Sequence, residues 1–204
     1  MKIIESILAV TFLPVMVLAQ QPKIISDATI AFSVSGTASA QNNFGSKTIY
    51  IKGKDIRIDF FSNAFNQTIF YNSNTGNATI LKEVGQSKYI SNYTAEEWKK
   101  ANEMYEGITV SFTSATKKIL DFNCKQAILK LKNGNIYTVF YTPDVVPSIT
   151  ENPFEFKEVP GLILEYEALL SGNEKIIYTA NKIDFTPVPS LEFKIPKTGY
   201  RVLH

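Results

Sequence analysis

Apolar and polar residues alternate along most of this chain, and turn-forming residues interrupt the alternation roughly every eight to twelve residues. Between Ile24 and Gly36, for example, Ile30, Phe32 and Val34 alternate with small, mostly polar residues. A period of two places apolar side chains on one face of a strand and polar side chains on the other. The pattern therefore predicts an antiparallel sheet of half-buried strands.

Two hairpins give the clearest turn signals. Segments 47–52 and 55–61 flank Gly53-Lys54, and their apolar residues share one face: Ile49, Ile51, Ile56, Ile58 and Phe60. Asn133-Gly134, a strong short hairpin signal, joins segment 122–132 to segment 135–141. Because segment 135–141 is apolar on both faces, it is expected to be a central strand that the helix or the following loop covers.

A single helix interrupts the strands. Thr94 and Glu97 form a capping box, in which each side chain accepts from the other residue's amide, and Gly107 is expected to end the helix. Trp98 is the only tryptophan of the chain. It is either the anchor that docks this helix on the sheet or part of a lid over a cavity.

A proline-rich loop is predicted over residues 142–160, which hold four of the nine prolines of the chain. Proline lacks the amide that a strand ladder needs, so the prolines are expected to prevent regular pairing. The loop nevertheless carries many apolar residues, and a long apolar loop either packs on its domain or covers a site. We expect it to admit a ligand or partner, and its marker residues are Pro143, Asp144, Pro147, Pro153 and Pro160.

The predicted fold is mainly β: an open, strongly curved antiparallel sheet, or half-barrel, covered by one short capped helix and the proline-rich loop. With 14 Phe and 10 Tyr, the chain has more apolar surface than one short helix can cover. A curved sheet with an incomplete lid is a natural pocket for an apolar ligand. The side chains expected to line it are Phe32, Ile58, Phe60, Trp98, Leu129 and Phe156.

The N-terminus has the pattern of a signal peptide. Lys2 gives a positive start, an apolar run extends from Ile7 to Leu18, and Ala19 suits cleavage. Residues 1–19 are therefore expected to be a signal peptide and residues 20–204 a single domain, exported to the periplasm or cell envelope. The apolar run is too short to span a bilayer, and no cysteine follows it to carry a lipid anchor.

Composition argues against several kinds of site. His204 is the only histidine and Cys124 the only cysteine, so no Ser-His-Asp set, Cys-His pair or histidine-rich metal site can be assembled. Cys124 is expected to be a buried core thiol. A formal net charge of +2 gives no electrostatic footprint for nucleic acid. We therefore expect no catalytic residues, metal or cofactor.

Several segments resemble a known family. The run from Lys117 to Ala127, the segment Tyr141-Thr142-Pro143-Asp144, and Pro160-Gly161-Leu162-Ile163-Leu164-Glu165 together resemble the GLPGLI-type exported proteins of Bacteroidetes. These proteins are similar to the lipoprotein-localisation (LolA/LolB-like) half-barrels. The resemblance implies an open antiparallel half-barrel with a helical lid and an apolar cavity in an exported protein, and it implies no activity.

Three functions follow as hypotheses. The first is a non-enzymatic envelope binding protein that holds a lipid, an acyl chain or a lipoprotein tail in the concavity. The second is a structural or protein-interaction module of the cell envelope, whose segment 160–167 contacts a protein partner. The third is an unrecognised hydrolase that uses carboxylates alone.

Overall fold

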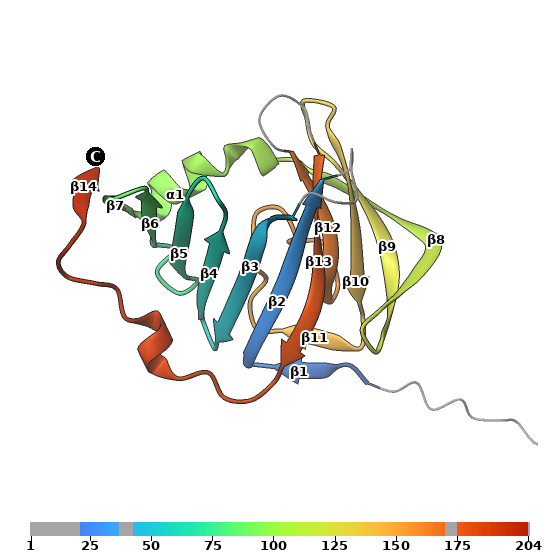
Figure 1. Cartoon of the computed structure of the whole chain (residues 1–204). Helices are drawn as coiled ribbons and strands as arrows, with labels where there is room; N and C mark the ends of the chain where they lie inside the picture. The colour runs from blue at the N-terminus through green and yellow to red at the C-terminus, as the bar shows by residue number, and fades with distance from the viewer. Residues whose placement is uncertain (1–20, 37–42, 170–174, 204) are drawn as a thin grey trace, which may run out of the picture.

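A computed structural model describes residues 21–36, 43–169 and 175–203, mostly as strands (Figure 1). The first half holds β1 (Lys23–Ile25), β2 (Asp27–Gly36), β3 (Asn43–Lys52), β4 (Asp55–Phe61), β5 (Asn66–Asn72), β6 (Ala78–Val84), β7 (Ser87–Tyr93), helix α1 (Ala95–Ala101) and the 3-10 helix η1 (Glu103–Tyr105). The second half holds β8 (Thr109–Ile119), β9 (Phe122–Lys130), β10 (Ile136–Thr142), β11 (Val145–Pro147), β12 (Leu162–Leu169), β13 (Lys175–Asp184), the 3-10 helix η2 (Ser190–Phe193) and β14 (Arg201–Leu203).

Twelve of these strands form one open, curved sheet (Figure 1). Its order is β14-β7-β6-β5-β4-β3-β2-β13-β12-β10-β9-β8. All neighbours are antiparallel except β14 and β7. The predicted mainly β half-barrel is therefore confirmed. The predicted signal peptide, residues 1–19, lies outside the described residues.

The local signals used to place turns and the start of the helix are confirmed, but Gly107 does not end the helix: α1 ends at Ala101, with Asn102 as its C-cap, and η1 lies between α1 and Gly107. Gly134 has a φ of +88° in the turn between β9 and β10, and β10 lies between β9 and β12, inside the sheet. At the start of α1, the Thr94 hydroxyl accepts from the Glu97 amide at 3.3 Å, and the Glu97 carboxylate accepts from the Thr94 amide at 2.8 Å. The capping box thus fixes where the helix begins.

The expectation that prolines prevent pairing in the loop is wrong at one place. β11, which ends at Pro147, pairs in parallel with β1. The hydrogen bonds that flank this pair come from other residues: the Lys23 amide donates to the Asp144 carbonyl and the Ser148 amide to the Ile25 carbonyl, both at 2.8 Å. Because these bonds do not use the position where Pro147 lacks an amide, the proline is tolerated.

The segment after β13, which we name the C-terminal arm (residues 185–203), lies on the sheet face opposite the predicted cavity. The Arg57 guanidinium on β4 donates to the Glu192 carboxylate of η2 at 2.9 Å, and Val188 is buried. The arm then adds β14 beside β7 at the edge of the sheet (Figure 1).

Candidate functional site: a cavity under the curved sheet

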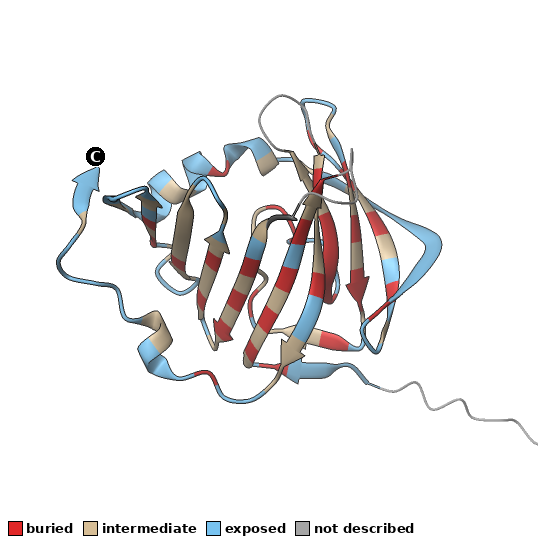
Figure 2. Cartoon of the chain, in the orientation of Figure 1, coloured by how far each residue is buried: buried red, intermediate tan, exposed pale blue. Residues whose placement is uncertain are grey.

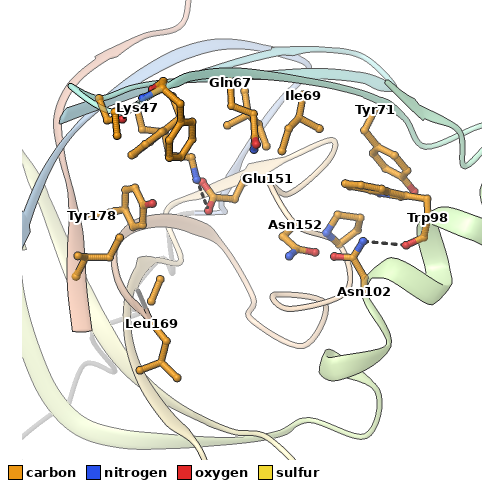
Figure 3. A pocket seen from close by; sticks show the side chains of 18 of the residues that line it. Lys47, Gln67, Ile69, Tyr71, Trp98, Asn102, Glu151, Asn152, Leu169 and Tyr178 are labelled. Atoms are coloured by element: carbon orange, nitrogen blue, oxygen red, sulfur yellow. Dashed lines mark hydrogen bonds and ion pairs between the residues drawn. The ribbon is translucent and has the colours of Figure 1, made fainter. Parts of the chain in front are cut away.

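A cavity of about 780 Å³ lies between the curved sheet, α1 and the proline-rich loop (Figure 3). The sheet forms one wall, α1 closes one end, and the loop passes below. The side chains that line it include Lys47, Ile58, Phe60, Gln67, Ile69 and Tyr71 from β3 to β5, Trp98 and Asn102 at the helix, Glu151, Asn152 and Pro153 from the loop, and Ala168, Leu169, Ile176 and Tyr178 from β12 and β13.

Three of the six side chains expected to line the cavity do line it: Ile58, Phe60 and Trp98. The structure places the other three in the packed core, since Phe32 is 1% exposed and Leu129 and Phe156 are 0% exposed. Phe156 comes from the loop itself, and its ring meets Tyr166 edge-on at 5.2 Å. The loop thus fills one part of the concave face and leaves the cavity in the rest. Buried positions are concentrated on the central strands, among them β2, β3 and β10, as Figure 2 shows.

Only one of the five loop residues expected to mark the entry of a ligand or partner lines the cavity. Pro153 lines the cavity, whereas Pro143, Asp144, Pro147 and Pro160 do not. Asp144 and Pro160 are exposed, and Pro147 belongs to β11. The part of the loop that borders the cavity is therefore its middle, from Glu151 to Pro153.

Trp98 docks α1 on the sheet and also lines the cavity. No residue of α1 is buried, so the helix contacts the sheet chiefly through this half-buried side chain. The indole ring lies 5.5 Å from the Tyr93 ring and 6.4 Å from the Tyr71 ring, measured between centroids. The Asn102 amide donates to the Trp98 carbonyl at 2.9 Å and fixes the end of the helix.

A lysine and a glutamate form a polar end to this cavity (Figure 3). The Lys47 ammonium lies 3.0 Å from the Glu151 carboxylate, and it also donates to the Tyr166 hydroxyl. It lies 4.8 Å from the centroid of the Tyr178 ring and 5.0 Å from that of Tyr166, and the two rings stack on each other. Cation–π contacts and the ion pair together hold a cation that is almost fully desolvated.

Burial around this ion pair raises the pKa values of the neighbouring carboxyl and phenol groups. Burial and the nearby Glu151 carboxylate raise the pKa of Glu155 to about 8, so that this carboxyl is largely protonated at neutral pH. Burial and the same carboxylate raise the pKa of Tyr178 to about 12 and raise the pKa of Tyr166 as well. At neutral pH the cluster therefore holds one cation and one anion.

Sequence reasoning did not identify Lys47 or Glu151 as site residues. The alternation of side chains along β3 indicates that Lys47 lies on the apolar face, because residues 47, 49 and 51 point to the same side of the strand and Ile49 and Ile51 belong to that face. Glu151 has no such signal. It lies in an irregular loop whose path depends on tertiary packing.

Other chemistry finds little support in the part of the chain that the structure describes. That part contains no group of three or more histidine, cysteine, aspartate or glutamate side chains that could hold a metal ion. The Cys124 side chain is fully buried, as expected, and burial raises its pKa to about 11. None of the described helices is long and apolar enough to cross a membrane.

Comparison with known proteins gives likenesses of structure only. No family model and no curated protein matches the sequence. Two crystal forms of PNGF-II are similar in structure, with TM-scores of 0.53 and 0.55 at 12% and 13% identity. They match over 86% and 87% of this chain, which spans only about 30% of PNGF-II. At this identity the likeness shows a shared fold alone.

Two further matches are weaker. An uncharacterised conserved protein from Thermus thermophilus matches at a TM-score of 0.49 and 6% identity, over 87% of this chain and 90% of that one. A LolA superfamily protein from Nitrosomonas europaea matches at a TM-score of 0.34 and 11% identity, over 86% of this chain and 93% of that one. Neither carries an argument about function, and the GLPGLI resemblance stays a prediction.

Proposed function

We propose that this chain is a non-enzymatic binding protein that holds a lipid or other acyl chain in the cavity under its sheet, and that it works in the periplasm or cell envelope. The observation that carries the proposal is the cavity itself. Its volume of about 780 Å³ lies within the range of ligand pockets. Its wall is formed largely by apolar and aromatic side chains, its charged side chains are Lys47 and Glu151, and its uncharged polar side chains include Gln67, Asn102 and Asn152.

The rival hypothesis of a protein-interaction module has less to support it. Leu162 and Leu164, in the segment expected to contact a partner, are 3% and 0% exposed. β12, which contains them, is paired on one side with β10 and on the other with β13. β12 therefore offers a partner neither its leucine side chains nor a free strand edge.

The hydrolase hypothesis gains no support from the strand carboxylates Asp59 and Glu165. Asp59 accepts two hydrogen bonds from the Arg57 guanidinium at 2.9 and 2.8 Å. Both oxygens of Glu165 accept from Lys117 at 2.7 Å. Both carboxylates are engaged in ion pairs and do not line the cavity.

Trp98 offers a direct test, because the only tryptophan of the chain lies in the cavity wall. Titration with palmitic acid brominated along its chain should quench the tryptophan fluorescence and saturate at one site. Native mass spectrometry after mild extraction should show a co-purified lipid.

A matched pair of variants provides the control. Ala168→Phe adds a ring at a cavity-lining position and should abolish the quenching, whereas Ala115→Phe adds the same ring at an exposed position of β8 and should leave it unchanged. Protein that is free of lipid and shows no saturable quenching would refute the proposed function.

A further inference from the structure

One carboxylate oxygen in the cavity wall lacks a hydrogen-bond partner. Among the described residues, Glu151 Oε2 is the buried side-chain polar atom for which the structure provides none. The Glu151 side chain is only 7% exposed, and its other oxygen takes the hydrogen bond from Lys47. A buried acceptor without a donor is costly, and proteins keep such groups where something else satisfies them. Because Glu151 lines the cavity, a small shift of its carboxylate toward the cavity brings the buried Oε2 within reach of a donor on a bound molecule.

The lysine, in contrast, is already satisfied. Its ammonium has three hydrogens. It donates to Glu151 and to the Tyr166 hydroxyl, and it lies over the rings of Tyr166 and Tyr178. An anionic head group would have to displace Glu151 from Lys47, and the freed carboxylate would then repel it. A carboxylate ligand is therefore disfavoured at this end.

The charge balance of the cluster also disfavours an ammonium head group. Lys47 and Glu151 neutralise each other at 3.0 Å. Glu155, only 6% exposed and next to Glu151, stays largely protonated at neutral pH because burial raises its pKa to about 8. A second cation would therefore enter a site that has no unbalanced anion and little water. An uncharged donor avoids both costs.

The cavity leads from this charged end to an end formed by aromatic rings, where the amide side chains of Asn102 and Asn152 also lie. Lys47 and Tyr178 lie at one end in Figure 3, and Tyr71 and Trp98 lie at the other. Ile69 lies on the sheet wall between them. A molecule with a donor at its head and an apolar chain behind it matches this order of surfaces.

We propose that the Lys47–Glu151 end of the cavity is a head-group site that selects uncharged amphiphiles with an O–H or N–H donor over the matching carboxylate anions. The proposal rests on the proposed function, since it presumes that the cavity holds the chain. It adds the chemical class of the ligand, and it assigns Glu151 as the residue that accepts a hydrogen bond from the head group.

The first test needs no variant. Four probes with the same chain length are compared at pH 7.5 by displacement of the brominated acid: palmitate, 1-monopalmitoylglycerol, palmitamide and hexadecylamine. The glycerol ester and the amide should bind about tenfold more tightly than palmitate or the amine, the size of effect expected when a buried unpaired group gains a partner. The ester and amide arms distinguish a hydroxyl donor from an amide donor.

The second test changes the head-group site alone. In Glu151→Gln, the amide oxygen can still accept from Lys47, and an NH2 donor replaces Oε2. The preference should therefore reverse, with palmitate gaining about tenfold relative to the glycerol ester. Glu158→Gln makes the same change at an exposed position of the same loop and should leave the preference as it is.

The outcomes separate the two proposals. If all four probes bind equally, or if Glu151→Gln leaves their ratio unchanged while the tryptophan is still quenched, the head-group site is refuted and the acyl-binding function stands. If no probe binds and the brominated acid does not quench Trp98, both proposals fail together.

Discussion

Gly161, the glycine before β12, gives a sharp prediction about what the Pro160-Gly161-Leu162 segment does. Its φ is +152°, and a Cβ built on it would lie 2.1 Å from the Thr142 carbonyl oxygen and 3.1 Å from the Tyr141 ring. Thr142 is paired with Leu162, so neither backbone can withdraw without disturbing the β10–β12 ladder. Replacing Gly161 with alanine should therefore destabilise the whole domain.

The size of the effect has two parts. A non-glycine residue in this region of backbone space costs about 1 to 3 kcal/mol. The clash with a carbonyl oxygen in a paired strand adds a further 1 to 3 kcal/mol or so, as overpacking does elsewhere. We expect Gly161→Ala to lower the free energy of unfolding by about 4 kcal/mol. In a domain of this size that corresponds to a fall in Tm of roughly 8 to 16 °C.

The matched control is Gly134→Ala. Gly134 also has a positive φ, +88°, but a Cβ there meets nothing within 4 Å. It should cost only the backbone part, about 1 to 2 kcal/mol. Urea unfolding followed by circular dichroism measures both. Equal losses in the two variants would show that the close approach to Thr142 is not what requires glycine at position 161.

Two further predictions concern buried charges. The folded-state pKa of Glu155, about 8, lies above its ordinary value of 4.5, so the stability that its protonation supports declines as pH rises from about 4.5 and is lost by about 8. Glu155→Gln should therefore gain stability relative to wild type between about pH 5 and pH 8 in urea unfolding, and a constant difference would contradict the assignment. Arg57→Ala leaves the buried Asp59 carboxylate without its ion-pair partner and should lower the free energy of unfolding by about 3 kcal/mol. Glu192→Ala breaks a more exposed ion pair of Arg57 and should lower it by under about 1 kcal/mol. Comparable losses of stability in thermal unfolding would argue against the difference in burial.

Features fixed by neighbouring residues were predictable from the sequence. The Asn133-Gly134 turn, the Thr94 capping box and the shared apolar face of Ile58 and Phe60 depend on local geometry, and all three occur in the structure. The strand period also places Phe32 correctly on the apolar face, in register with Lys47. Period alone does not say which part of that face is filled by other elements, so Phe32 and Ile58 look equivalent in sequence and differ in the fold.

What could not be predicted depends on the path of the proline-rich loop. Phe156 packs against Tyr166 and fills the concavity, while Glu151, five residues earlier, borders the part left open. Both positions lie in a segment with no periodicity. Their placement is a result of long-range packing, and so is the ion pair that joins Glu151 to Lys47 across more than a hundred residues of sequence.

The C-terminal arm has a consequence for the order of events during synthesis. β7 is complete early in translation, but β14, the strand that borders it, leaves the ribosome only after every other strand. Until then β7 is an uncovered edge whose amides and carbonyls can pair with another nascent chain. The arm thus covers the middle of this edge, residues 89–91, late in synthesis, and a chain truncated after β13 would leave it uncovered.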